Sequence, residues 1–224
     1  MEATARLRTI PRLISLDLGG TVGRVEGPGI ATLLAQASPL TPAEVRRILR
    51  KQLHVLPSLS AERISVVCEA LHIDASVFPI GHVPPRFCPY VGAAAAIESL
   101  SRLATVVTLS NVCCLDYDAL AMERVLGTDV AAQYPSCLLG HSKPDARAFR
   151  TVAARHGVTT DSLLHIGDDW ECDVMGALDA GAQAVWLTHG GSVPPSDVSG
   201  RDRLTVARDL PDAADTLREM LARV

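Results

Sequence analysis

Four short motifs carry residue types that can bind a metal ion and act as a nucleophile. They are Asp17-Leu18-Gly19-Gly20-Thr21, Ser110-Asn111, Lys143-Pro144, and Gly167-Asp168-Asp169 with Asp173 shortly after it. Carboxylates supply the oxygen ligands that Mg²⁺ prefers, and a hydroxyl and an ammonium can bind the oxygens of a phosphoryl group. A carboxylate can also attack an electrophile and form a covalent intermediate.

Each motif taken alone also has a purely structural explanation. Asp17 could begin a turn, Ser110 could cap a helix, and Asp168 or Asp169 could cap the helix that follows it. The chemistry therefore depends on whether the fold brings the motifs together.

The apolar pattern predicts a fold that does so. Buried strands are expected at residues 13–16, 105–109, 163–166 and 184–187, and helices at residues 91–103, 115–126, 146–156 and 174–180. Strands that alternate with helices predict an α/β fold with a doubly wound parallel sheet. Ligands of such sheets bind at the carboxyl ends of the strands, so we expect Asp17, Ser110, Lys143, Asp168 and Asp173 at one edge.

Residues 22–86 follow a different pattern. Thr41, Pro42 and Glu44 are a cap residue, a first-turn proline and a capping-box acid, and they predict a helix to about residue 56. Ser60 begins a second predicted helix, to about residue 72. We therefore predict a small helical insert at 22–86 that covers the active edge of a core formed by residues 1–21 and 87–224.

Composition excludes several classes of protein. The chain has 224 residues, 48% of them hydrophobic, and a net charge of −4. This content can fill a core, whereas the charge disfavours nucleic acid as a partner. No window of about 18 apolar residues indicates a membrane span, and we expect a cytoplasmic protein without a membrane partner. The six cysteines include no CxxC pair, so we expect reduced, structural thiols.

Taken in this order, the four motifs resemble those of the haloacid dehalogenase-like (HAD) hydrolase superfamily. The similarity extends from about residue 13 to residue 187, and the helical insert lies where that family has its cap. The resemblance implies a Rossmann-like core and a Mg²⁺-dependent phosphatase. The implied substrate is a small phosphorylated metabolite, hydrolysed through an aspartyl intermediate.

The resemblance implies a role for each residue that matches a motif. Asp17 would be the nucleophile, and Lys143 would offset negative charge on the nucleophile and the substrate. Ser110 would bind the phosphoryl group, with Asn111 and Thr21 as further substrate-binding residues.

The implied Mg²⁺ site contains Asp17, the carbonyl group of Gly19, and Asp168. Either Asp169 or Asp173 would complete it. Asp173 fits the spacing of the family better.

Gly19 departs from the family pattern. Phosphatases of this family have a second Asp at this position, which protonates the leaving group and later activates water. General acid–base assistance is typically worth about 10²–10⁴-fold in rate, and glycine cannot supply it. A structural reason for the glycine would be an unusual backbone turn.

Three hypotheses follow from Gly19. The first is a phosphatase in which water or a cap histidine (His54, His72 or His82) handles the proton. The second is a hydrolase of C–P or C–halogen bonds, such as a phosphonatase in which Lys51 forms an imine with a phosphonate substrate. The third is a catalytically weak or inactive binding or regulatory protein.

Overall fold

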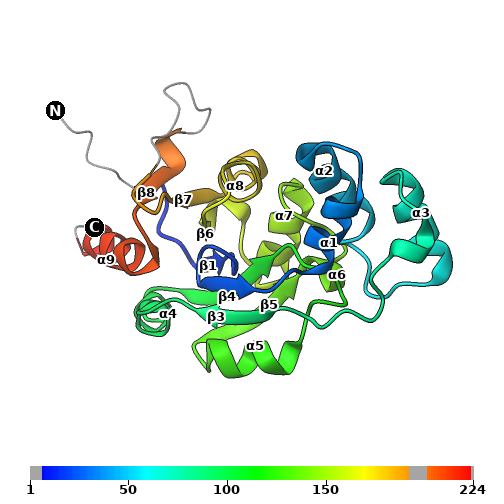
Figure 1. Ribbon diagram of the computed structural model, residues 1–224. Coiled ribbons are helices and arrows are strands. Elements are labelled where there is room, and N and C mark those ends of the chain that lie inside the picture. Colours follow the sequence, from blue (N-terminus) through cyan, green and yellow to red (C-terminus); the bar gives the residue numbers. More distant parts are fainter. Residues whose placement is uncertain (1–6, 192–200, 223–224) are drawn as a thin grey trace.

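A six-stranded sheet forms the centre of the molecule (Figure 1). The computed structural model describes residues 7–191 and 201–222. The strands are parallel and lie in the order β5 (Val130–Pro135), β4 (Thr105–Ser110), β1 (Leu13–Leu16), β6 (Leu163–Gly167), β7 (Gln183–Leu187) and β8 (Leu204–Ala207). The predicted α/β fold with a parallel sheet is confirmed.

Helices cover both faces of this sheet because successive strand residues point to opposite sides. In β1, Ile14 and Leu16 face one apolar core, whereas Leu13 faces the other. The first core contains residues of α4 (Ala93–Ser101), α5 (Ala119–Leu126) and α9 (Leu210–Leu221). The second contains residues of α6 (Ser136–Leu139), α7 (Ala146–Arg155) and α8 (Gly176–Ala180).

The register of the central strands aligns the ends from which the motif residues emerge. Leu16, the last residue of β1, pairs with Thr108 of β4 and with Ile166 of β6. The chain therefore leaves all three strands at the same edge of the sheet, as predicted for Asp17, Ser110 and Asp168.

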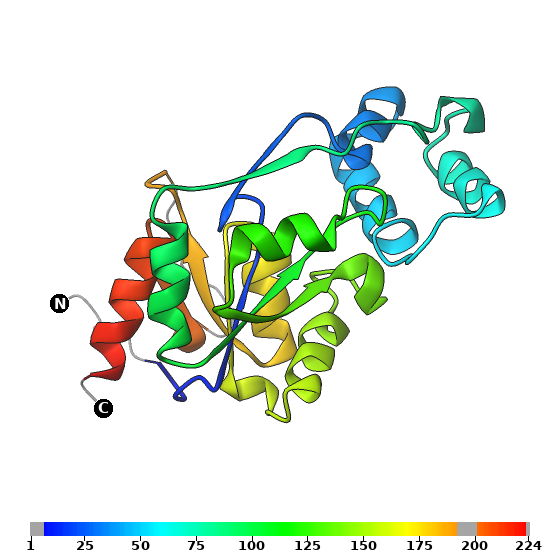
Figure 2. The same ribbon diagram turned by 90° about the horizontal axis from the view of Figure 1, so that it is seen from below.

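A helical insert follows β1 and has an apolar core of its own. It contains α1 (Ile30–Ala37), α2 (Pro42–Gln52), α3 (Ala61–Ala70) and the 3₁₀ turn η1 (Ala75–Val77). Thr41 and Glu44 form the expected capping box of α2. Two extended segments join the insert to the rest of the molecule, and β2 (Gly23–Glu26) pairs with β3 (Arg86–Pro89) in an antiparallel ribbon (Figure 2).

The structure also contains elements that the apolar pattern did not predict. These are the edge strands β5 and β8, the ribbon β2–β3, the helices α1, α6 and α9, the 3₁₀ turns η1, η2 (Thr160–Ser162) and η4 (Arg201–Arg203), and the π-helical turn η3 (Trp170–Met175). The helix expected from residue 115 begins at Ala119, because the Asp118 side chain accepts from the Ala121 N–H and caps it there. Within the described residues, no helix has the length and apolarity needed to cross a membrane.

Candidate active site

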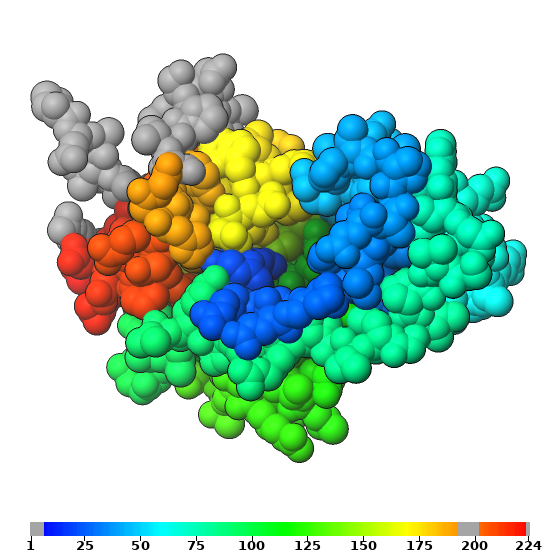
Figure 3. Space-filling view, in the orientation of Figure 1, coloured from blue at the N-terminus to red at the C-terminus, as the bar shows by residue number. Residues whose placement is uncertain are grey.

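A cavity of about 1100 Å³ lies between the carboxyl edge of the sheet and the helical insert. In the space-filling view it is the hollow between the blue N-terminal segments and the yellow segment around α8 (Figure 3). Its wall includes Asp17, Ser110, Lys143, Asp168 and Asp173, so the fold brings these five predicted residues to one cavity.

A buried lysine joins the two acidic ends of this group. The Lys143 ammonium lies 2.7 Å from Asp17 Oδ1 and 2.6 Å from Asp173 Oδ1, and all three side chains are almost fully buried. Burial alone would lower the pKa of Lys143, but the two carboxylates outweigh burial and raise it. Lys143 is therefore a fixed positive charge beside Asp17.

Three carboxylates of the site can hold a cation. Ligand oxygens of Asp17, Asp168 and Asp173 all lie within 4.8 Å of one another. Three carboxylates and one ammonium sum to −2, the charge that a divalent ion would neutralise. Burial raises the pKa of Asp17, Lys143 opposes this effect and Asp173 adds to it, and together they bring the pKa to about 7. A hard cation with oxygen ligands, such as Mg²⁺, fits this donor set.

A second layer of hydrogen bonds orients Asp173. His165 Nε2 lies 3.2 Å from Asp173 Oδ1, and Ser15 Oγ lies 2.7 Å from His165 Nδ1. Burial lowers the pKa of His165, so the neutral ring donates to the carboxylate and accepts from the serine hydroxyl. The backbone N–H of Asp169 donates to Asp173 Oδ2 at 2.9 Å.

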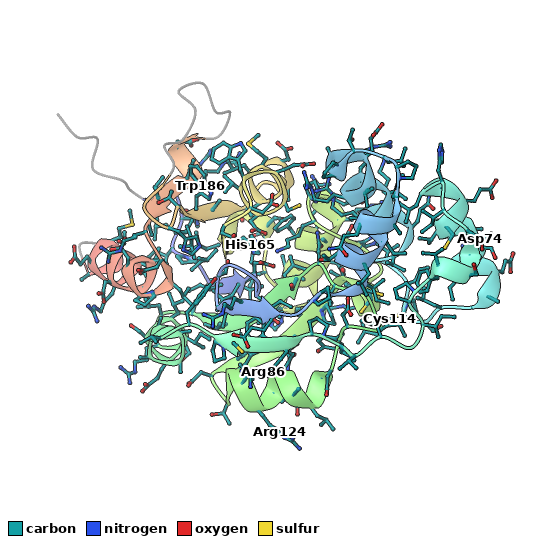
Figure 4. The ribbon with its side chains drawn as sticks, in the orientation of Figure 1. Asp74, Arg86, Cys114, Arg124, His165 and Trp186 are labelled. Atoms are coloured by element: carbon teal, nitrogen blue, oxygen red, sulfur yellow. The ribbon has the colours of Figure 1, made fainter. Side chains whose placement is uncertain are left out.

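Sequence analysis did not identify His165. It lies in the middle of β6 and near the centre of the molecule in Figure 4. Its signal is the one ionisable side chain within the otherwise apolar strand Leu163–Gly167.

Ser110 and Asn111 follow β4 but make different contacts. The Ser110 hydroxyl lines the cavity, and it has no hydrogen-bond partner in the described part of the chain. The Asn111 amide donates to the Lys143 carbonyl at 2.7 Å and accepts from the Lys143 N–H at 2.8 Å. In this structure Asn111 therefore holds the lysine segment, while Ser110 is free to bind a ligand.

The turn after Asp17 gives Gly19 no steric reason to be glycine. A Cβ added at Gly19 would meet no atom within 4 Å, and the residue lacks a left-handed backbone conformation. Gly20 differs, since it has φ +83° and a Cβ there would lie 2.2 Å from Asp168 Oδ2. Thr21 is buried, and its hydroxyl has no hydrogen-bond partner among the residues that the structure describes.

Of the two residues that could complete the metal site, the structure places Asp173 beside Asp17 and Asp168. Asp169 is exposed, and its Oδ1 accepts from the Cys172 N–H at 2.8 Å. Asp169 therefore caps the turn η3 that presents Asp173 to the cavity.

Comparison with known proteins relates this geometry to a family. Residues 141–213 match a family model described as HAD-hydrolase-like. The 2-haloacid dehalogenase of Pseudomonas syringae superimposes with a TM-score of 0.61 at 21% identity, over 95% of this chain and 99% of the other. Residues 141–213 therefore resemble HAD-like hydrolases in sequence, and the chain shares the fold of that dehalogenase.

Two further relatives extend the comparison. The magnesium-bound HAD-hydrolase YfnB of Bacillus subtilis has a TM-score of 0.55 at 17% identity, over 94% of this chain and 100% of the other. The phosphoserine phosphatase of Thermus thermophilus is 28% identical over 171 residues, which are 75% of this chain. The chain spans only 62% of the length of that phosphatase.

The histidines of the insert occupy different environments. His54 lines the cavity, its buried Nδ1 has no hydrogen-bond partner among the described residues, and burial lowers its pKa to about 4. His82 Nε2 lies 2.5 Å from Asp116 Oδ1, and His72 is exposed. Lys51 is exposed on α2 and is not among the residues of the cavity wall.

Proposed function

We propose that this protein is a HAD-like hydrolase and acts as a Mg²⁺-dependent phosphatase of a small phosphorylated metabolite. The observation that carries the proposal is the position of Asp17 between the Lys143 ammonium at 2.7 Å and the carboxylates of Asp168 and Asp173. A nucleophile beside one fixed cation and a site for another suits attack on a negatively charged group. The resemblance to a phosphoserine phosphatase supports the same class of substrate.

The reaction at this site would proceed in two steps. Asp17 attacks phosphorus, the bond from phosphorus to the leaving oxygen breaks, and an aspartyl phosphate forms. Water then attacks phosphorus, and the bond to Asp17 breaks to release phosphate. Lys143 offsets charge on Asp17, and the Ser110 hydroxyl donates to a phosphoryl oxygen. Mg²⁺ held by Asp17, Asp168 and Asp173 would neutralise charge on the phosphoryl group.

The helical insert would act as a cap, with boundaries at residues 22–86 between core segments 1–21 and 87–224. It covers the cavity and contributes His54 to its wall. Since Gly19 supplies no acid, the proton for the leaving oxygen comes from water or from a cap residue. Among the three cap histidines, His54 is the one that lines the cavity with Asp17, but its lowered pKa leaves the ring neutral near pH 7, so water is the better proton source.

Hydrolysis of a carbon–halogen bond is the second candidate, and Gly19 is the observation that favours it. A halide leaves without taking up a proton, so no acid is needed at position 19. The three clustered carboxylates favour the phosphatase instead, because displacement of halide from carbon creates no charge that a divalent cation must neutralise. Lys51, which an imine-forming phosphonatase would need in the cavity, is exposed outside it.

The test uses two phosphate esters or anhydrides whose leaving groups need little protonation, acetyl phosphate and p-nitrophenyl phosphate. We expect Mg²⁺-dependent phosphate release, which EDTA suppresses and Asp17→Asn abolishes. Asp118→Asn is the matched control, because Asp118 also lines the cavity but caps α5. Release of chloride from 2-chloropropionate without phosphatase activity would favour the dehalogenase. Phosphate binding with no turnover of any substrate would favour the binding protein.

A further inference from the structure

Arg50 links the cap to two core loops beside the candidate active site. Its guanidinium donates to Glu171 Oε1 at 2.8 Å and to Cys172 Sγ at 3.1 Å. Its backbone carbonyl accepts from Ser142 Oγ at 2.8 Å. One residue near the end of α2 therefore contacts both the segment before Lys143 and the turn η3.

The environment of this arginine indicates more than a surface ion pair. The Arg50 side chain is only 14% exposed, whereas that of Glu171 is 63% exposed. A buried guanidinium loses hydration, and an exposed carboxylate returns little of that free energy. Its other partner, the Cys172 sulfur at 3.1 Å, is a weak hydrogen-bond acceptor. The contacts of Arg50 therefore offset little of the free-energy cost of burying its charge.

The two contacted loops hold the two partners of one short ion pair. Ser142 directly precedes Lys143, and Cys172 directly precedes Asp173. The ammonium of Lys143 lies 2.6 Å from Asp173 Oδ1. Arg50 therefore contacts the neighbour of each member of this pair from a helix that belongs to the cap.

Two further hydrogen bonds between the cap and the core go to a different segment. The N–H of Ile30, at the start of α1, donates to Asp116 Oδ2 at 2.9 Å, and His82 contacts Asp116 Oδ1. Asp116 lies in the segment between β4 and α5. These contacts anchor the two linkers of the cap, whereas Arg50 contacts the core from α2.

We propose that Arg50 is a positioning residue, which fixes Lys143 relative to Asp173 when the cap is docked on the core. The catalytic geometry is then complete only in the docked state, so the cap controls the chemical step as well as access to the cavity. The inference rests on the proposed phosphatase function. It assigns Arg50 no contact with substrate.

The test compares Arg50→Met with Lys51→Met, since Lys51 is the adjacent cation of α2 and is exposed. Acetyl phosphate is the substrate, because its small leaving group needs no contact with the cap. Misplacing catalytic groups by about 1 Å can lower a rate about 100-fold. We expect Arg50→Met to lower kcat about 10- to 100-fold with a much smaller change in KM, and Lys51→Met to change kcat less than about twofold.

Two further variants separate positioning from folding. Arg50→Lys should restore part of kcat, because an ammonium can pair with Glu171 but cannot form the two-pronged contact. Ser142→Ala removes the hydroxyl that contacts the Arg50 carbonyl, keeps the guanidinium, and should also lower kcat. Limited proteolysis of the cap linkers, followed without substrate, should be faster in Arg50→Met than in Lys51→Met.

Several results would overturn the proposal. They are equal kcat values for Arg50→Met and Lys51→Met, or a lower melting temperature for Arg50→Met with unchanged kcat per folded molecule. If Arg50→Met does not fold, an unchanged kcat in Ser142→Ala overturns it instead. Failure of the proposed function is a different result, in which the Asp17→Asn variant hydrolyses acetyl phosphate as fast as the wild-type protein does.

Discussion

The side chain of Asn111 forms two hydrogen bonds with the backbone of Lys143: it accepts from the Lys143 N–H at 2.8 Å and donates to the Lys143 carbonyl at 2.7 Å. Such a pair of bonds fixes both the position and the direction of the lysine segment. The Lys143 side chain can then reach Asp17 and Asp173 together. The resemblance assigns Asn111 to substrate binding. Its amide therefore has a second role, which is to position the Lys143 ammonium.

Replacing Asn111 by Ala should affect both stability and catalysis. The substitution leaves the N–H and carbonyl of the buried Lys143 without these partners, at a cost of about 1–3 kcal/mol. We expect kcat for acetyl phosphate to fall about 10-fold or more, because the ammonium is no longer held beside Asp17. Urea denaturation and steady-state kinetics measure the two effects. A variant with lowered stability but wild-type kcat would show that Asn111 does not position Lys143 for the reaction.

The sequence predicted the elements that place the site, because they are strongly apolar. The runs at β1, β4, β6 and β7 are buried on both faces of the sheet, so composition alone distinguishes them. The strands β5 and β8 lie at the two edges of the sheet and contain fewer large apolar residues. The ribbon strand β2 has the sequence GRVE, which shows no apolar signal.

Motif residues were predicted well where chain position decides their location, and poorly where side-chain contacts decide it. Strand ends at one edge of the sheet put Asp17, Ser110 and Asp168 together, which parallel topology requires. The choice of Asp173 as metal ligand and Asp169 as cap depends on the π-helical turn η3, which no pattern indicated. The contacts of Arg50 join residues separated by more than 90 positions, so no local pattern could predict them.

Gly19→Asp should raise the activity of the enzyme. The position is open, since a Cβ would meet nothing within 4 Å and the backbone needs no glycine conformation. An Asp there would supply the missing acid, and such assistance is worth about 10²–10⁴-fold in rate. We expect the largest gain for alkyl phosphates such as glycerol phosphate, and a smaller gain for p-nitrophenyl phosphate, whose leaving group needs less help.

The adjacent glycine provides the control for this prediction. Gly20→Ala places a Cβ 2.2 Å from Asp168 Oδ2, at a residue with φ +83°. We expect this smaller substitution to reduce activity strongly, because it displaces a carboxylate of the metal site. Equal rates for Gly19→Asp and wild type on every alkyl phosphate would mean that another group already protonates the leaving oxygen.

Mg²⁺ should stabilise the folded protein through the three carboxylates. A ligand at about 100 times its Kd adds about 2.7 kcal/mol to the free energy of unfolding. Asp168→Asn should remove this response, yet stabilise the metal-free protein, because burial and then Asp173 raise the pKa of Asp168 and oppose its charge. Thermal unfolding with Mg²⁺ and with EDTA measures both effects.

The Asp169→Asn variant tests whether Asp169 belongs to the metal site or only caps the turn beside it. Asp169 caps the turn η3, and loss of a cap residue typically costs about 1 kcal/mol. Asparagine also caps helices well, so we expect this variant to keep both its stability and its response to Mg²⁺. A lost Mg²⁺ response in Asp169→Asn would place that carboxylate in the metal site after all.

His54 should make the stability of the protein depend on pH. Burial lowers the pKa of His54 from 6.5 to about 4 in the folded state. Between these two values the unfolded chain binds a proton that the folded protein excludes, so the free energy of unfolding falls as pH falls from 6.5 towards 4. The upper limit of this contribution is about 3 kcal/mol, from about 1.4 kcal/mol for each unit of pKa shift.

His54→Asn removes the titrating group from the cavity wall and should flatten this part of the pH dependence. The exposed His72 provides a matched control, because its backbone has φ 57° and asparagine tolerates that conformation well. Urea denaturation at pH 7.5 and pH 5 compares the three proteins. We expect the loss of stability between these pH values to be smaller in His54→Asn than in the wild type and in His72→Asn. Identical losses in all three would show that the His54 ring is hydrated in the folded protein, and therefore that it does not form part of a desolvated cavity wall beside Asp17.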